Sequence, residues 1–256
     1  MGTVRVERNG ATASLVIDNP ERRNAMTASM YAATPAAVGE IVDDPEIRVV
    51  VLRGAGDEAF GAGSDISEFP ERRLGGSAAS YDATEHAAWE ALAAIEVPVI
   101  AAVHGPCMGG GIAMALHADL RIAADDATFA VPPARLGIAY PPEALDRLVE
   151  LVGPAQAQLL LFTARVIDAR EAMSIGLVQA VVPKAELDEH VEALADDITR
   201  LAPLTHVATK ASIAARRDPR RSPDAESARR RCYESADFRE GVQAFLDKRR
   251  PAFRGR

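Results

Sequence analysis

The chain has 256 residues, of which 48% are hydrophobic and 26% charged, a composition typical of a folded globular protein. Its 29 Lys and Arg residues and 37 Asp and Glu residues give a formal net charge of -8, which disfavours nucleic acid and anionic membrane surfaces as partners. The two cysteines, Cys107 and Cys232, cannot form a disulfide framework, and no Cys/His cluster has metal-ligand spacing. We therefore expect a reduced protein without a metal site.

The sequence contains no segment with the pattern of a signal peptide or a membrane span. Residues 1–18 alternate charged and apolar side chains and lack the apolar core of a signal peptide. The longest apolar run, residues 97–103, is too short to cross a bilayer. These features predict a cytoplasmic protein with no membrane partner.

The N-terminal elements begin with a hairpin. Two short β-type runs, 4–6 and 13–17, flank the dipeptide Asn9-Gly10, which tolerates the positive φ of a tight turn. Residues 27–42 then predict a helix that Pro35 kinks or splits, because proline removes a backbone donor.

The following elements alternate between strand and helix. We expect them, in chain order, at residues 47–52 (strand), 83–95 (helix), 97–103 (strand), 109–117 (helix), 120–123 (strand) and 178–182 (strand). Pro154 and a capping box at Asp168 and Glu171 predict two further helix starts, the second helix ending at Gly176. From residue 187 onward the pattern is helical. We therefore predict an α/β core over 1–186 and a helical region over 187–256.

Two glycine-rich turns, 60–66 and 104–111, each follow a strand of the buried type. Three consecutive glycines at a helix start cost about 1 kcal/mol each in helix propensity. They leave free N–H groups that stabilise negative charge and that a ligand can approach. Neither turn matches a P-loop, a dinucleotide fingerprint or a nucleophile elbow. The turns fit either a backbone hole for an enolate or tetrahedral oxyanion, or close packing of helix on sheet.

Six stretches together carry a family resemblance, and they are 49–54, 60–66, 98–119, 129–137, 162–182 and 238–253. Through them the chain resembles the enoyl-CoA hydratase/isomerase family, the crotonase superfamily. The resemblance implies a crotonase-type spiral of ββα turns with a C-terminal helical trimerisation region, and a homotrimer or homohexamer. It also implies an acyl-CoA thioester substrate, with coenzyme A as part of the substrate and no separate cofactor. The N–H groups of Ala62 and Gly110 are implied to hold the thioester oxygen as it becomes an enolate.

Both glutamates that the family uses for acid/base catalysis are replaced. The one after the glycine triplet is Ala113 here, and the one that follows a proline is Pro133. Neither residue can transfer a proton, so the usual route for adding water across a double bond lacks both of its groups.

Two nearby residues are candidates for the missing chemistry. Tyr140 matches a tyrosine of methylmalonyl-CoA decarboxylase relatives, which need no general base to begin their reaction. Glu143 is the carboxylate nearest to the lost one, and either catalyses or lies solvated in the first turn of a helix. The activity that the family resemblance implies is enoyl-CoA hydratase/isomerase. The alternatives are a decarboxylase or other lyase using Tyr140, and a catalytically silent acyl-CoA-binding protein.

Several further residues are candidates for substrate contacts or for structural roles. Arg23 is a candidate for the phosphates of coenzyme A, and the other expected substrate contacts are Ala62, Ser64, Asp65, Ile66, Gly110, Ala113 and Pro133. Asp65 also fits a helix cap. We expect His86 and His117 to be structural because neither has a carboxylate at i,i+4 spacing. The arginine-rich segment 216–231 is typical of a solvated, partly paired helical face.

Overall fold

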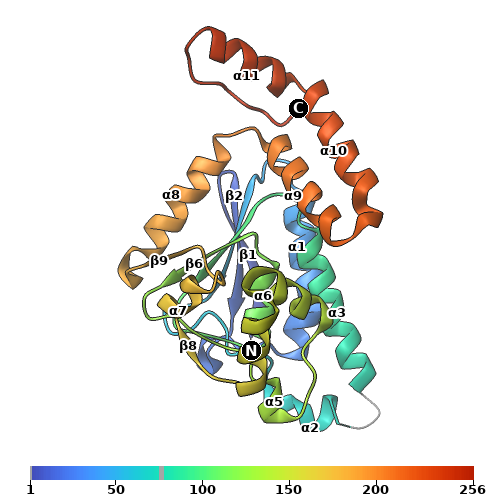
Figure 1. The fold of residues 1–256 in the computed structure, drawn as a ribbon, viewed down its shortest axis with the longest axis vertical. Coiled ribbons are helices and arrows are strands. Elements are labelled where there is room, and N and C mark those ends of the chain that lie inside the picture. Colours follow the sequence, from blue (N-terminus) through green and yellow to red (C-terminus); the bar gives the residue numbers. More distant parts are fainter. Residues whose placement is uncertain (1, 75–77) are drawn as a thin grey trace.

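Figure 1 shows the computed structural model, which describes residues 2–74 and 78–256. Its strands are β1 (Thr3–Asn9), β2 (Thr12–Asp18), β3 (Val49–Gly54), β4 (Val99–Val103), β5 (Pro106–Met108), β6 (Leu120–Ala124), β7 (Thr128–Ala130), β8 (Ile167–Asp168) and β9 (Ala180–Val182). A central sheet has the order β1-β2-β3-β4-β6-β9, and a smaller sheet has the order β5-β7-β8. In the central sheet only the β1/β2 pair is antiparallel.

Helices make up most of the chain. The α-helices are α1 (Ala28–Val42), α2 (Phe69–Arg72), α3 (Ala78–Ala94), α4 (Gly110–His117), α5 (Pro133–Leu136), α6 (Pro142–Thr163), α7 (Ala169–Ser174), α8 (Leu187–Thr199), α9 (Pro203–Arg217), α10 (Ser222–Glu234) and α11 (Ala236–Leu246). Short 3-10 turns are η1 (Pro20–Arg22), η2 (Ile66–Glu68), η4 (Lys184–Glu186) and η5 (Pro219–Arg221). Within the described residues, no helix is both long enough and apolar enough to cross a membrane.

Successive strands enter different sheets. The chain passes from β4 in the central sheet to β5 in the smaller sheet and then into α4. It repeats this path through β6, β7 and α5. Each repeat adds one strand to each sheet before its helix, which confirms the predicted α/β class and the spiral of ββα turns.

Strand β3 begins after Arg48, and it explains why residues 49–52 are all apolar. Val49 and Val51 pack in one cluster with apolar residues of α8. Val50 and Leu52 point to the other face, into the cluster that includes residues of α1 and α3. Figure 1 shows α8 on one side of the sheet and α1 and α3 on the other. Because successive side chains of a strand point to opposite faces, a strand covered on both sides must be apolar throughout.

Most of the predicted local signals are confirmed. The hairpin pairs Asn9 with Thr12 across Gly10, whose φ is 59°. Gly153 has non-helical angles inside α6, so that a second helical segment starts at Pro154 as predicted. The Asp168 carboxylate accepts the Glu171 N–H at 2.8 Å and caps α7. Strand β9 is shorter than the predicted 178–182.

The expected split at Pro35 is wrong. Helix α1 continues through this proline, and the Thr27 side chain caps its start by accepting the Met30 N–H. Tyr31 and Ile41, on either side of the proline, are both buried in the core. Burial of this helix face stabilises the helix enough to offset one missing hydrogen bond.

The C-terminal region does not behave as one unit. Leu187 and Val191 of α8 are buried against the central sheet, so α8 packs as part of the core although it follows the predicted boundary at 187. Helix α9 is tied to the core by Lys210, whose Nζ lies 2.8 Å from Asp119 Oδ2. Helices α10 and α11 extend beyond the core (Figure 1).

Candidate active site

The two glycine-rich turns lie against each other. Gly61 donates its N–H to the Pro106 carbonyl at 3.1 Å and accepts the Met108 N–H at 2.9 Å. A Cβ added to Gly111 would lie 2.3 Å from the Gly61 oxygen, a distance that no side chain tolerates. Gly111 is therefore required for close packing, as one of the two interpretations of the turns predicts.

Gly110 supports the other interpretation. It is the first residue of α4, and its N–H has no acceptor among the described residues. The Ser64 N–H is likewise unpartnered within residues 2–74 and 78–256, although Ser64 lies beside Met26: the Met26 N–H donates to the Gly63 carbonyl, and the Asp65 N–H donates to the Met26 carbonyl. A Cβ on Gly110 would lie 3.3 Å from Ser64 N. Two free N–H groups therefore lie side by side, the arrangement that stabilises an oxyanion.

The assignment of Ala62 to this hole is wrong. Its N–H donates to the Arg23 carbonyl at 2.9 Å and is not free for a ligand. Two residues further on, the Ser64 N–H has no acceptor within the described residues, and a Cβ on Gly110 would lie 3.3 Å from its nitrogen. The structure thus pairs Gly110 with Ser64.

A small cavity of about 80 Å³ opens in front of these N–H groups. Most of the predicted substrate contacts line it, namely Ala62, Ser64, Ile66, Gly110, Ala113 and Pro133. Ala113 and Pro133 are both buried and line the cavity, so the two positions at which the family resemblance implies glutamates present an alanine and a proline to it.

Two predicted contacts lie elsewhere. Asp65 caps η2 by accepting from Ser67 N at 3.1 Å and Ser67 Oγ at 2.6 Å, and it forms an ion pair with Arg22. Burial acts to raise the pKa of Asp65, but these hydrogen bonds outweigh it and lower the pKa. The Asp65 side chain is therefore a cap and is not among the residues that line the cavity. Arg23 is exposed and lines a separate surface hollow with Asp57, and its contact with coenzyme A stays a prediction.

The two catalytic candidates differ in position. Tyr140 lines the cavity as predicted, and its hydroxyl donates to the Gly109 carbonyl at 3.2 Å. Glu143 lies in the first turn of α6 and lines an adjoining hollow, where its Oε1 is 3.2 Å from His86 Nδ1. The position of Glu143 fits its interpretation as a solvated helix-terminal carboxylate and does not support a catalytic role.

Glu85 is a cavity residue that the sequence analysis missed. It lies on α3 and is only 6% exposed, and its Oε1 is 3.4 Å from Ser64 Oγ. Burial raises its pKa, and the nearby Arg73 guanidinium, 3.5 Å from Oε2, lowers it; the net effect is a raised pKa. The available signal was its spacing, because Glu85 falls on the buried stripe of α3 formed with Tyr81, Ala88, Trp89 and Leu92. A carboxylate on an apolar helix face is rarely without a role.

Of the two histidines that we expected to be structural, His117 is buried in the core. His117 donates from Nδ1 to the Ala113 carbonyl at 2.7 Å and stacks on Trp89, and burial lowers its pKa to about 3. For His86 the expectation of no carboxylate at i,i+4 spacing overlooked Glu90, which lies 3.4 Å away. No group of three or more His, Cys, Asp or Glu side chains in the described part of the chain is placed to hold a metal ion.

Cys107 and the arginine-rich segment 216–231 lie outside the cavity, and their surroundings do not indicate a catalytic role. Cys107 is fully buried, and burial raises the pKa of its thiol far above the usual value, so it is not a thiolate. Several arginines of segment 216–231 form surface ion pairs, such as Arg217 with Glu150 and Arg220 with Asp218. This confirms the predicted solvated, partly paired face.

Comparison with known proteins assigns the family. The sequence profile of enoyl-CoA hydratase/isomerase matches residues 7–256. The chain is 36% identical over 251 residues to a crotonyl-CoA hydratase of Syntrophomonas wolfei subsp. wolfei, covering 97% of this chain and 96% of that protein. It is 34% identical over 264 residues to a carnitinyl-CoA dehydratase of Salmonella typhi, covering 99% of each.

The fold gives the same result. The crystal structure of an enoyl-CoA hydratase/carnithine racemase from Magnetospirillum magneticum superposes with a TM-score of 0.93 at 36% identity, covering 100% of this chain and 97% of that one. The match in sequence and in fold thus extends over nearly the whole chain. The protein therefore belongs to the enoyl-CoA hydratase/isomerase family, the crotonase superfamily.

Proposed function

We propose that this protein binds an acyl-CoA thioester and stabilises its enolate between the N–H groups of Ser64 and Gly110. The observation that carries the proposal is the pair of adjacent, unpartnered N–H groups facing one cavity. Fixed donors of this kind stabilise negative charge that develops on a carbonyl oxygen. The relatives named for crotonyl-CoA and carnitinyl-CoA support a coenzyme A thioester as the substrate. The proposal requires no cofactor beyond the coenzyme A of the substrate.

The decarboxylase alternative is less well supported. Such a reaction needs a donor that orients the substrate carboxylate or the developing enolate. The Tyr140 hydroxyl would have to give up its hydrogen bond to the Gly109 carbonyl to do this. Burial raises the pKa of Tyr140 well above its ordinary value, so the hydroxyl stays protonated and acts as a donor and not as a base; the engaged hydrogen bond is therefore what counts against this alternative.

Titration calorimetry with butyryl-CoA and with free coenzyme A tests the proposal directly. We expect the thioester to bind more tightly than free coenzyme A, because only the thioester offers a carbonyl to the hole. Incubation with 2-enoyl, 3-enoyl, 3-hydroxyacyl and methylmalonyl thioesters, followed by mass spectrometry, then identifies the reaction. Binding without any product would support the silent binding protein, and absence of binding would contradict the proposal.

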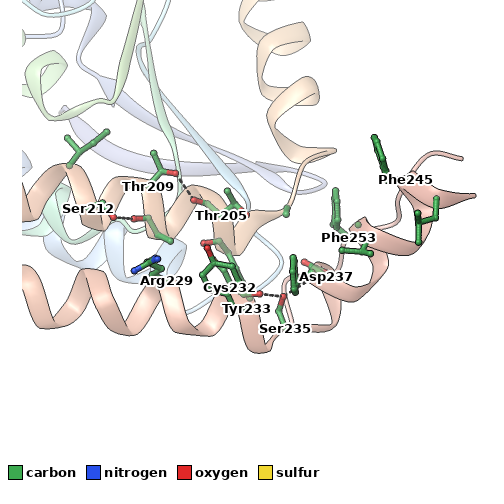
Figure 2. A pocket seen from close by; sticks show the side chains of 18 of the residues that line it. Thr205, Thr209, Ser212, Arg229, Cys232, Tyr233, Ser235, Asp237, Phe245 and Phe253 are labelled. Carbon is green, nitrogen blue, oxygen red and sulfur yellow. Dashed lines mark hydrogen bonds between the residues drawn. The ribbon is translucent and has the colours of Figure 1, made fainter. Parts of the chain in front are cut away.

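The C-terminal helices support a second proposal, that the protein assembles as a trimer or a pair of trimers. A hollow of about 800 Å³ lies between α9, α10 and α11. Figure 2 shows Tyr233, Phe245 and Phe253 among the side chains that line it. Helix α11 carries an exposed apolar stripe at helical spacing, formed by Phe238, Val242, Phe245 and Leu246. A continuous apolar surface of this kind is typical of a protein interface. A second copy of the chain is the occupant that the family resemblance implies.

Replacement of Phe245 tests this interface. Its side chain is 83% exposed, so Phe245→Asp should leave the fold intact while placing a charge in the contact. We expect sedimentation to give three or six times 27.2 kDa for the unmodified protein and a smaller assembly for the variant. Phe162→Asp, at a 77% exposed position of α6, is the matched control and should not change the mass. A monomeric unmodified protein at micromolar concentration would refute the proposal.

A further inference from the structure

We infer that Glu85 is the carboxyl group that moves protons on the bound thioester. The inference rests on the proposed function, because it needs an acyl-CoA in the cavity. Of the side chains that line this cavity within the described residues, Glu85 carries the only carboxyl group. It comes from α3, whereas both positions at which the family carries its glutamates lie outside that helix, at Ala113 and Pro133.

Ser64 links this carboxyl group to the oxyanion hole. The Ser64 N–H is one of the two hole donors, and the Oγ of the same residue lies 3.4 Å from Glu85 Oε1. The Tyr31 hydroxyl lies 2.9 Å from that Oγ and completes a short polar network. Only the Ser64 side chain therefore separates the Glu85 carboxyl group from the oxyanion hole. A carboxyl group at this distance can reach the carbon atoms next to a carbonyl bound in the hole.

Arg73 holds the opposite side of the carboxyl group. Its guanidinium lies 3.5 Å from Glu85 Oε2 and 3.0 Å from Asp82 Oδ1, and it is stacked over the rings of Phe69 and Tyr81. This fixes Oε2 and leaves Oε1 directed toward Ser64 and the cavity. A buried carboxyl group held in one orientation is suited to proton transfer, because it is already oriented toward the substrate when the substrate binds.

The electrostatic surroundings agree with this geometry. The ionisable or polar groups that face Glu85 are Arg73, Asp82, Ser64, Tyr31, Tyr81 and Tyr140. Burial, which raises its pKa, outweighs the attraction of Arg73, which lowers it. A carboxyl group whose pKa is raised is a stronger base when it is ionised, and it keeps its proton over a wider pH range for use as an acid.

A single carboxyl group favours a one-base reaction. The Glu85 carboxylate takes a proton from C2 of a 3-enoyl thioester: the C2–H bond breaks, an O–H bond forms, and the electron pair moves onto the carbonyl oxygen held by Ser64 and Gly110. The same carboxylic acid then gives the proton to C4, and the double bond moves from C3=C4 to C2=C3. No oxidant, reductant or water is consumed. The site therefore fits isomerisation of a 3-enoyl-CoA better than hydration, which must also activate a water molecule.

Exchange of the C2 proton isolates the first step. Butyryl-CoA is incubated with the protein in D₂O, and deuterium uptake at C2 is followed by mass spectrometry. We expect the unmodified protein to catalyse exchange, and Glu85→Gln to slow it at least 100-fold while its affinity for butyryl-CoA stays the same. Glu90→Gln, which removes a 70% exposed carboxyl group of the same helix, is the matched control and should exchange at the unmodified rate.

The outcomes distinguish a failure of the Glu85 role from a failure of acyl-CoA binding. Exchange by Glu85→Gln within twofold of the unmodified protein would overturn the role of Glu85 and leave the acyl-CoA proposal standing. So would an unmodified protein that binds butyryl-CoA without exchanging its proton. Absence of binding by the unmodified protein would overturn both. If Glu85→Gln does not fold, Glu85→Asp takes its place: a carboxyl group drawn back by one methylene should lose at least tenfold in exchange without losing affinity, and an unchanged rate would contradict the inference.

Discussion

Replacing Gly110 with proline is expected to lower turnover of an acyl-CoA thioester by about 10²- to 10³-fold, the usual loss when one donor of an oxyanion hole is removed. Proline has no N–H, so the hole would keep only the Ser64 donor. The helix itself should survive, because Gly110 is the first residue of α4 and proline is well tolerated at that position. Deuterium exchange at C2 of butyryl-CoA and calorimetric affinity are the two measurements.

Gly110→Ala is the control for the added bulk. A Cβ at this position lies 2.7 Å from the Tyr31 hydroxyl, the end of a side chain, and 3.3 Å from Ser64 N. Alanine brings this crowding but keeps the N–H, so the difference between the alanine and proline variants reports the missing donor. Circular dichroism confirms that both variants remain folded. Equal activity in the unmodified protein and Gly110→Pro would refute the assignment of this N–H to the hole.

Much of the fold was predictable because its determinants are local or periodic. The predicted strand at 47–52, which is apolar from residue 49 to residue 52, indicates a strand covered on both faces, and β3 indeed packs against α8 on one face and α1 and α3 on the other. Pro154 and Asp168 begin helical segments for reasons contained in a few neighbouring residues. The continuity of α1 through Pro35 was not predictable in this way, since it depends on burial of that helix against distant parts of the chain.

The cavity was located from the sequence, but its donors were not. Nothing in the segment 60–66 shows whether Ala62 or Ser64 directs its N–H to the ligand, because the choice depends on pairing with Arg23 and Met26 from an earlier part of the chain. Glu85 was missed for a related reason. Its position on the buried stripe of α3 is visible in the sequence, but only the packing of α3 beside the glycine-rich turns brings its carboxyl group into the cavity.

Tyr140 illustrates the same limit for a single atom. The sequence places its ring near the thioester, and the ring does line the cavity. The hydroxyl, however, donates to the carbonyl of Gly109, a backbone atom whose orientation follows from the positive φ of 50° at that glycine. Sequence reasoning identified the residue, whereas the availability of its proton depends on the turn it contacts.

Hydration of crotonyl-CoA is expected to be slow, by about 10²- to 10⁴-fold for each absent proton-transfer group, when this protein is assayed beside the Syntrophomonas wolfei crotonyl-CoA hydratase. Ala113 and Pro133 face the cavity and carry no titrating group. If Glu85 supplies one carboxyl group, as we infer, one proton-transfer role is missing and the rate deficit corresponds to that role. If Glu85 does not take part, two roles are missing. Absorbance of the conjugated thioester gives the rate.

Restoring the two carboxyl groups should recover part of this rate. Both Ala113→Glu and Pro133→Glu direct a side chain toward a cavity of only about 80 Å³, so the two added side chains must push neighbouring side chains aside. We therefore expect the hydration rate to rise at least tenfold but not to recover fully. The matched variant with glutamine at both positions has nearly the same volume but cannot exchange protons, and its rate should not rise. A gain shared by the glutamine variant would point to a change of shape as the cause. Hydration by the unmodified protein at the rate of the reference enzyme would show that the residues now present, Glu85 among them, already supply both proton transfers.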